Sequence, residues 1–235
     1  MNDSAAIILG ASGSVGHALL AEVLASGRFS RVFVMTRRPL ELPPGANAEG
    51  RLVPDMTPAK LTQAVVDTLR DCATDAVGFS VLGIGAGTAK LTLEQHRAVD
   101  VNLNAAFARG LKASGKVRQL CFMSAVGADI NAKTTGSGAA GMPRYARVKG
   151  ESEAAVVKEG PPIVCIFRPS LIIGSQHSPR VLAAVMTLFA PLTPAKLRPI
   201  RTTQIARAMV AAALRPPATT SIYQYPEMMA LIGGK

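Results

Sequence analysis

The sequence is poor in cysteine, in aromatic residues and in long apolar runs, and each shortage excludes a class of protein. Its three cysteines, Cys72, Cys121 and Cys165, are widely spaced with no CxxC pair, which argues against a disulfide framework or a zinc site and predicts a cytoplasmic protein. No apolar run reaches the ~18 residues of a membrane-spanning helix. Seven phenylalanines, three tyrosines and no tryptophan, without a basic run of five, argue against a nucleic-acid partner.

What is present indicates one globular domain. The chain has 235 residues, of which 49% are hydrophobic and 17% charged, so it can bury a sizeable core and is not disordered throughout. We expect a single domain over residues 1–235. The net charge of +11 favours anionic partners. The three histidines are isolated in the sequence, so no metal site is expected.

Short apolar runs alternate with helical patterns along the whole chain. The runs are almost continuously hydrophobic, which is typical of strands buried on both faces of a parallel sheet. We therefore predict an α/β fold with a doubly wound parallel sheet, Rossmann-like, in three layers and with strand order 3-2-1-4-5-6. The six expected strands are 5–9, 31–36, 51–54, 76–82, 119–124 and 163–168.

Several expected helices have recognisable ends. Thr57 and Pro58 predict a helix start, and Thr92 with Gln95 predicts a capping box for a long helix that Gly115 closes. A further helix is expected from about Pro143 to the Gly-Pro-Pro stop at 160–162. After the sixth strand, helices are expected at about 178–189 and 203–215. Segments 174–200 and 216–235 are expected to form a small helical cover over a substrate.

A glycine-rich turn links the first expected strand to the first expected helix. In such a turn the backbone amides and the positive helix end can bind a pyrophosphate. The spacing is GxxGxxG, and a tight strand-to-helix turn also needs glycine, so a purely structural turn is the alternative. The predicted dinucleotide-binding residues of the turn are Gly10, Ser12, Gly13, Ser14, Val15 and Gly16.

The end of the second expected strand indicates which dinucleotide binds. Arg37 and Arg38 lie there, with no acid before Glu41. Two guanidinium groups can pair with a 2′-phosphate, whereas no carboxylate accepts a hydrogen bond from a free 2′-hydroxyl, so we predict NADP(H). Solvated arginines are the alternative interpretation. The remaining contacts expected at strand ends are Asp55 with the adenine amino group and Leu82 and Gly83 beside the ribose.

Tyr145 and Lys149 are four residues apart and therefore lie on one helical face. A nearby ammonium favours the phenolate, lowers the tyrosine pKa and makes the phenol a better proton donor or acceptor. Lys149 can also bind the nicotinamide ribose. Ser124, at the end of the fifth expected strand, can hydrogen-bond a substrate carbonyl. The alternatives are a half-buried helical tyrosine and a solvated lysine.

In these motifs the chain resembles the short-chain dehydrogenase/reductase superfamily over essentially its whole length. GASGSVG, the arginine pair, MSAVGAD, YARVKGESEA and FRPSLIIG are most similar to its small atypical branch, which includes the NADPH-binding protein Tip30 and bacterial NAD(P)H-binding oxidoreductase-like proteins. The resemblance implies that Ser124, Tyr145 and Lys149 are catalytic. It also implies that Ile172 and Arg180 contact the cofactor, together with the turn, arginine and strand-end residues named above.

The sequence thus predicts an NADP(H)-dependent oxidoreductase that moves a hydride between the nicotinamide and a carbonyl or alcohol substrate. An NADPH-binding sensor or scaffold without turnover is the main alternative, and an epimerase or dehydratase is the third. Seven cations and no acid between Glu159 and Glu227 are compatible with an anionic substrate, with pairing to carboxylates elsewhere or with plain solvation. The apolar tail can dock on the body of the chain or on a second subunit, which leaves a homodimer open.

Overall fold

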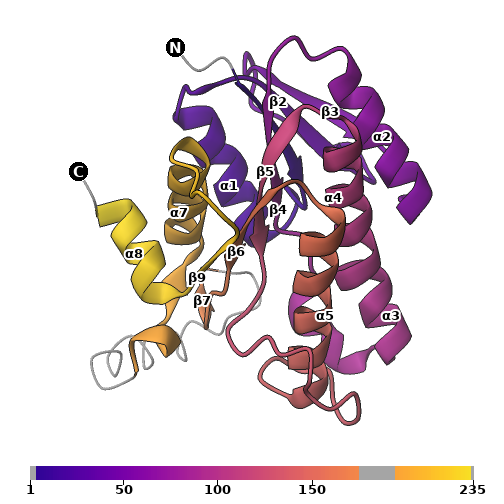
Figure 1. Ribbon diagram of the computed structural model, residues 1–235, viewed down its shortest axis with the longest axis vertical. Helices are drawn as coiled ribbons and strands as arrows, with labels where there is room; N and C mark the ends of the chain where they lie inside the picture. The colour runs from indigo at the N-terminus through magenta and orange to yellow at the C-terminus, as the bar shows by residue number, and fades with distance from the viewer. Residues whose placement is uncertain (1–3, 175–193, 234–235) are drawn as a thin grey trace.

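The computed structural model describes residues 4–174 and 194–233 of the chain. Seven strands form one parallel sheet in the order β3-β2-β1-β4-β5-β6-β9. Helices cover both of its faces, with α1, α7 and α8 on one side and α2, α4 and α5 on the other (Figure 1). The prediction of a doubly wound, three-layered α/β sheet is confirmed, and so is the 3-2-1-4-5-6 order of the first six strands.

The elements alternate between strand and helix for most of the chain. The strands are β1 (Ser4–Leu9), β2 (Phe29–Thr36), β3 (Ala48–Leu52), β4 (Ala76–Ser80), β5 (Val117–Met123), β6 (Ile163–Phe167), β7 (Ile172–Ile173), β8 (Ile200–Arg201) and β9 (Ser221–Tyr223). The helices are α1 (Ser14–Ala25), α2 (Pro58–Arg70), η1 (Gly85–Lys90), α3 (Leu93–Arg97), η2 (Ala98–Leu103), α4 (Asn104–Ala113), α5 (Pro143–Glu159), η4 (Ala195–Leu197), α7 (Thr202–Leu214) and α8 (Tyr225–Gly233).

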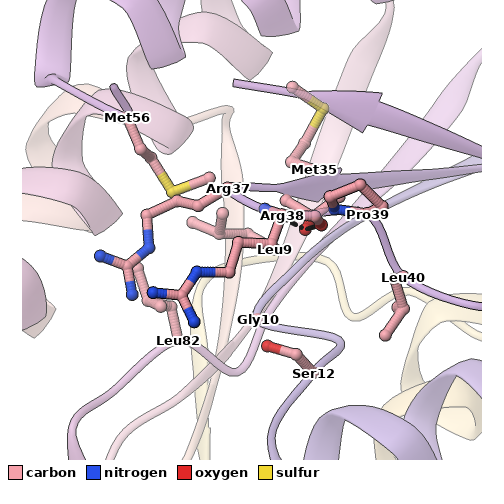
Figure 2. A pocket seen from close by; sticks show the side chains of 11 residues that line it. Leu9, Gly10, Ser12, Met35, Arg37, Arg38, Pro39, Leu40, Met56 and Leu82 are labelled. Carbon is pink, nitrogen blue, oxygen red and sulfur yellow. Dashed lines mark hydrogen bonds between the residues drawn. The ribbon is translucent and has the colours of Figure 1, made fainter. Parts of the chain in front are cut away.

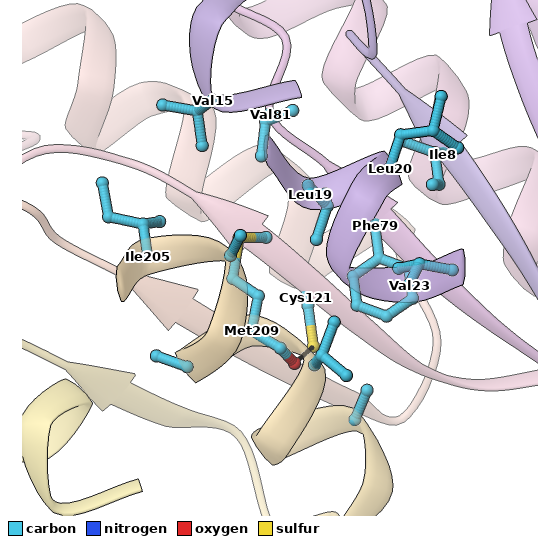
Figure 3. Packing of buried hydrophobic residues seen from close by; sticks show 14 of the residues in the cluster. Ile8, Val15, Leu19, Leu20, Val23, Phe79, Val81, Cys121, Ile205 and Met209 are labelled. Carbon is cyan, nitrogen blue, oxygen red and sulfur yellow. Dashed lines mark hydrogen bonds between the residues drawn. The ribbon is translucent and has the colours of Figure 1, made fainter. Parts of the chain in front are cut away.

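The central strands are hydrophobic throughout because each of their faces is covered by a different helix layer. In β1, Ala6 and Ile8 face the layer of α1 and α7, whereas Ile7 and Leu9 face the layer of α2 and α4. Figure 3 shows the first of these cores, in which side chains of α1 and α7 pack on β1, β4 and β5. Strands of this kind must lie inside the sheet, and this places their carboxyl ends side by side at one edge.

The predicted helix signals act as expected in α2 and α3. The Thr57 side chain accepts a hydrogen bond from the Lys60 amide, and Pro58 occupies the first helical position. Thr92 and Gln95 form the predicted capping box. In α2, a stripe of three fully buried side chains faces the core, and each contributes about 1.5–3 kcal/mol through removal from water. These side chains are Leu61, Val65 and Leu69.

Three elements differ from expectation. The third strand, expected at 51–54, spans Ala48–Leu52. The long helix expected between Thr92 and Gly115 is interrupted by the π-helical stretch η2, which divides it into α3 and α4. The C-terminal segment 216–235 was expected to cover a substrate. Instead it adds β9 to the sheet beside β6 and packs α8 on α7 (Figure 1). Met228 of α8 is fully buried, so this tail docks on the body of the chain.

A small second sheet, β7 with β8, follows the main sheet in the chain. Of the segment 174–200 that was expected to cover a substrate, 175–193 lie outside the described residues, together with the helix expected at about 178–189. The helix expected at 203–215 is α7, at Thr202–Leu214. Within the two described stretches, no helix is both long enough and apolar enough to cross a bilayer.

Candidate functional site

The glycine turn joins β1 to α1 at the carboxyl edge of the sheet. Gly10 has a φ of 91°, which favours glycine, and a Cβ there would lie 2.7 Å from the Leu82 amide nitrogen at the end of β4. A Cβ on Gly16 would lie 2.1 Å from the Gly10 carbonyl oxygen. The backbone of the turn therefore requires glycine at positions 10 and 16. For these two glycines, the alternative of a purely structural turn is sufficient.

Gly13 is different because the protein itself does not require it. Its φ is −82°, which any residue can adopt, and a Cβ there would meet only the Gly10 carbonyl oxygen, at 3.6 Å. Gly13 is the N-cap of α1, and the first turn of that helix holds no acidic residue. Space without a side chain in front of a helix N-terminus suits the close approach of an anionic group to backbone amides.

Substituting Gly16 is therefore expected to affect stability, whereas substituting Gly13 is expected to affect dinucleotide binding. Gly16→Ala forces its Cβ into the backbone of the turn and is expected to cost about 1–3 kcal/mol of unfolding free energy. Gly13→Ala is expected to leave the unfolding free energy within about 0.5 kcal/mol but to weaken dinucleotide binding about tenfold or more. Thermal unfolding and calorimetric titration measure the two effects. Unchanged affinity in a folded Gly13→Ala variant would contradict a phosphate-binding role for this turn.

Two adjoining pockets of about 380 and 330 Å³ lie along this edge of the sheet. Both are lined by Gly10, Ser12, Arg37, Met56 and Leu82, so they form one continuous groove. Figure 2 shows the first pocket, with the guanidinium groups of Arg37 and Arg38 side by side and facing the strand ends that carry Gly10 and Leu82. The groove thus combines the glycine turn with two positive charges.

Arg37 and Arg38 are exposed, and no ion pair among the described residues involves either of them. The turn that carries them is held by Thr36, whose hydroxyl accepts a hydrogen bond from the Arg38 amide at 3.2 Å. Their charges are therefore available to a ligand in the groove.

The third strand end contributes Met56 rather than Asp55 to the groove. Asp55 is exposed and pairs with Lys60, which lowers the pKa of its carboxyl group. It lines neither pocket, whereas Met56 lines both. The fourth strand end agrees with expectation more closely, because Leu82 and Gly83 both line the second pocket.

Tyr145 and Lys149 lie on successive turns of α5, as their spacing predicts. The Lys149 ammonium nitrogen is 5.7 Å from the centroid of the Tyr145 ring. Tyr145 is half-buried, and Lys149 is only 5% exposed, so the interpretation of Lys149 as a solvated surface lysine is wrong. A Cβ added to Gly83 would lie 3.3 Å from this nitrogen, which brings Lys149 to the groove at the end of β4.

Asp100, in η2, is the counter-ion of Lys149. Its Oδ1 accepts a hydrogen bond from the ammonium group at 2.7 Å, and the carboxylate is 1% exposed. Burial alone would lower the pKa of Lys149, but the Asp100 carboxylate and Tyr145 outweigh burial, so this pKa lies above its ordinary value. Burial alone would raise the pKa of Asp100, but Lys149 and His96 hold it below its usual range. Both groups are therefore charged at neutral pH.

Ser124 directly follows β5, at the same edge of the sheet. Its amide donates to the Phe167 carbonyl at 2.7 Å, which fixes its position between β5 and β6. Its hydroxyl is buried and makes no hydrogen bond with the described residues. The loop that follows returns to α5, where the Asp129 amide donates to the Ala146 carbonyl, next to Tyr145. A buried hydroxyl without a partner is costly and suits a site that a ligand completes.

Sequence reasoning missed a buried polar stripe that borders Tyr145 and Lys149. The ring of His96 lies 5.8 Å from that of Tyr145, and its Nε2 is 3.7 Å from Asp100 Oδ1. Asn104 accepts from the Ser80 hydroxyl and donates to the Leu82 carbonyl at 3.3 Å, which ties α4 to the end of β4. His96, Asp100 and Asn104 recur every four residues. The sequence therefore already contains a signal for them, because this spacing predicts one polar face of a helix.

Two further expected cofactor contacts lie after β6. Ile172 is in β7, paired with Ile200 of β8. Arg180 lies outside the described residues. Of the other cations after Glu159, Arg168 forms a bidentate pair with Glu153 at 2.9 and 2.6 Å, a carboxylate that the sequence did not suggest as its partner.

The parallel sheet with a glycine turn at its first strand defines a Rossmann-like α/β protein. No family model matches the chain. Two curated proteins are 27% identical to it, both named Protein FMP52, mitochondrial. The one from Eremothecium gossypii aligns over 178 residues, 74% of this chain and 68% of that protein. The one from Candida glabrata aligns over 183 residues, 75% of this chain and 67% of that protein.

The names of these relatives correct the expected cytoplasmic location. Both are called mitochondrial, so the cytoplasmic prediction is wrong. The cytoplasmic prediction rested on the small number of cysteines. Cysteine usage indicates whether a compartment is oxidising or reducing, but it does not distinguish one reducing compartment from another.

Solved structures share the fold across nearly the whole chain. MoeE5 in complex with UDP-glucose and NAD has a TM-score of 0.66 and 14% identity, covering 97% of this chain and 80% of that one. The crystal structure of gox2181 has a TM-score of 0.67 and 12% identity, covering 97% of each. WbmG of Bordetella bronchiseptica, in complex with NAD and UDP, has a TM-score of 0.65 and 14% identity, covering 98% and 78%. At these identities the likeness shows the Rossmann-like fold.

Proposed function

We propose that the protein is an NADP(H)-dependent oxidoreductase of the short-chain dehydrogenase/reductase type, which transfers a hydride between the nicotinamide and a carbonyl or alcohol substrate. One observation carries the proposal: the buried Lys149 ammonium beside Tyr145 lies against Gly83, which lines the same groove as the glycine turn and Arg37. A proton-transfer group and a groove suited to a dinucleotide therefore adjoin at one edge of the sheet.

The residues of the groove fit a nicotinamide dinucleotide. The open space at Gly13 suits the pyrophosphate, which the backbone of Ser12, Gly13, Ser14 and Val15 would bind. Arg37 and Arg38 would pair with the 2′-phosphate, while Leu82 and Gly83 would flank the ribose. Ile172 and Arg180 are proposed on the resemblance alone. The bound cofactor supplies or accepts the hydride.

The chain's own residues would handle the proton and the substrate oxygen. The Tyr145 hydroxyl would give a proton to the carbonyl oxygen, or take one from the alcohol, as general acid or base. The ammonium charge of Lys149 would stabilise the negative charge that develops on the phenol oxygen, and its remaining donors would bind the ribose. The Ser124 hydroxyl, which has no hydrogen-bond partner in the described part of the chain, would donate to the same substrate oxygen and orient it.

A two-part experiment tests this function. Calorimetric titration with NADPH and NADH is expected to give clearly tighter binding of NADPH. An absorbance screen at the nicotinamide band, against aldehydes, ketones and quinones, is then expected to show NADPH oxidation with at least one class. Equal or tighter binding of NADH would contradict the role of the two arginines.

The second candidate is a cofactor-binding sensor or scaffold without turnover. The observation in its favour is that the Lys149 ammonium is bound to Asp100 at 2.7 Å, so a buried carboxylate compensates its charge. Tight NADPH binding with no oxidation across the whole substrate panel would favour the sensor. An epimerase is a third candidate, because solved neighbours include proteins titled as epimerases and complexes with UDP-sugars.

The partners of the site are also part of the proposal. The ligand is a small molecule, and an anionic one would suit Lys196 and Arg201, two exposed cations that follow β6. A mitochondrial location is proposed on the names of the two relatives. A homodimer remains a proposal, tested by the mass of the protein in solution.

A further inference from the structure

The π-helical stretch η2, between α3 and α4, lies beside the candidate site. A π turn leaves backbone groups without their usual helical partners, and such turns occur often at functional sites. Here two side chains bind the carbonyl of Asp100: it accepts from Asn104 Nδ2 at 2.8 Å and from the Ser152 hydroxyl of α5. The irregular turn is thus held in place from two sides, and it fixes the direction of the Asp100 side chain.

Both oxygens of the Asp100 carboxylate are used. Oδ1 accepts from the Lys149 ammonium at 2.7 Å, and Oδ2 accepts from the Ile84 amide at 3.2 Å. A Cβ on Gly83 would lie 3.3 Å from Oδ1 as well as from the ammonium nitrogen. The carboxylate therefore lies between the end of β4 and α5, directly behind the part of the groove that Gly83 lines.

His96 adds a second group to the same carboxylate. It is fully buried one turn before Asp100, and neither of its ring nitrogens makes a hydrogen bond with the described residues. Its distance of 3.7 Å from Oδ1 is too long to replace the ammonium as a partner. Asp100 is the only carboxylate that forms an ion pair with Lys149 among the described residues. Glu153 of α5 also raises the pKa of Lys149, but its own ion pair is with Arg168.

We propose that Asp100 is a positioning residue, placed by the π turn to keep the amine of Lys149 protonated and directed toward Gly83 and Tyr145. This role rests on the proposed function, in which Lys149 binds the nicotinamide ribose. The ammonium group has three donors, and among the described residues it uses one of them, on Asp100. Two donors remain for a ligand in the groove.

The physical reason is the cost of a buried amine. Without a counter-ion, a lysine that is only 5% exposed loses its proton more easily, because burial disfavours the charged form. Asp100 reverses this effect, and the pKa of Lys149 lies above its ordinary value. A buried ion pair of this kind adds little net stability compared with an apolar pair of the same shape. What it provides is a positive charge held in a fixed place beside the groove.

The Asp100→Asn variant tests the role through the pH dependence of NADPH binding. With its counter-ion removed, Lys149 is expected to lose its proton as the pH rises, because burial now dominates its pKa. Relative to wild type, NADPH affinity should therefore be close to normal at pH 6 and about tenfold or more weaker at pH 9, since one pKa unit is a tenfold change. Glu94→Gln is the matched control: it removes an exposed carboxylate from α3, directly before η2, and should show no such divergence from wild type.

The double variant Asp100→Asn/Lys149→Met separates a local charge effect from general damage. Asp100→Asn alone leaves an unpaired buried ammonium and should lower the melting temperature, and adding Lys149→Met should recover part of that loss. Should Asp100→Asn not fold, Asp100→Glu keeps the charge and should retain wild-type pH dependence of binding with weaker affinity.

A measurement on the cofactor-free protein keeps this inference apart from the proposed function. In wild type, the ¹⁵N signal of the Lys149 ammonium should remain that of a charged amine up to pH 9, and in Asp100→Asn it should titrate below pH 9. Identical titration in both proteins, or a pH profile of Asp100→Asn that matches Glu94→Gln, would overturn the role of Asp100. Failure of wild type to bind NADPH or NADH would instead overturn the proposed function and leave the ¹⁵N result to decide the role of Asp100.

Discussion

Replacing Tyr145 with phenylalanine is expected to lower the rate of NADPH oxidation by about 10²–10⁴-fold, the usual contribution of a general acid or base. The substitution removes one hydroxyl group and keeps the ring. That ring lies 5.7 Å from the Lys149 ammonium nitrogen and 5.8 Å from the ring of His96. NADPH affinity should stay within about twofold of wild type, because the groove of Gly10, Arg37 and Leu82 is untouched.

The rate is measured at the nicotinamide absorbance band with whichever carbonyl compound the substrate screen identifies, and the affinity by calorimetric titration. Tyr225→Phe is the matched control, because it removes the same hydroxyl from the first residue of α8 and should leave the rate unchanged. Retained turnover in Tyr145→Phe would remove the phenol from the mechanism. A loss of NADPH affinity equal to the loss of rate would show that the hydroxyl contributes to cofactor binding.

The strands that were predicted correctly from the sequence are those buried on both faces. The inner strands are β1, β2, β4, β5 and β6, and their hydrophobic runs mark them directly. The two edge strands lack this signal because one side of each faces solvent. β3 has the sequence AEGRL with Leu52 at its exposed end, and β9 is three residues long with Ile222 46% exposed. Their pairing depends on neighbours far along the chain, which no local pattern reports.

The candidate site divides in the same way. The glycine turn, the arginine pair and the four-residue spacing of Tyr145 and Lys149 are local patterns, and the structure brings them to one edge of the sheet. Asp100 could not be assigned to Lys149 from the sequence, because the two are 49 residues apart and lie in different helices. Asp55 lies outside the groove and pairs with Lys60, and neither its position nor this contact can be read from the sequence.

The arginine pair should determine which cofactor binds. Arg37→Gln/Arg38→Gln keeps two polar side chains of similar length but removes both charges. Each charged hydrogen-bonding group contributes about 1.5–3 kcal/mol, so the loss of two should weaken NADPH binding by about 100-fold or more. NADH has no 2′-phosphate, and its affinity should therefore change less than about threefold. The outcome is a protein that no longer prefers NADPH.

The geometry of the groove makes this a specific expectation rather than a general charge effect. Both guanidinium groups face the same space above Gly10 and Leu82 (Figure 2), and no ion pair of the described residues would be broken by their removal. Arg28→Gln is the control: Arg28 is exposed just before β2, at the opposite end of the strand that Arg37 follows, and its removal should leave both affinities unchanged. Titrations of wild type, the double variant and Arg28→Gln at two salt concentrations distinguish a contact with the 2′-phosphate from a general charge effect. If the double variant loses affinity for NADPH and NADH by the same factor, the two arginines act on the pyrophosphate or on the overall field, and the 2′-phosphate assignment fails.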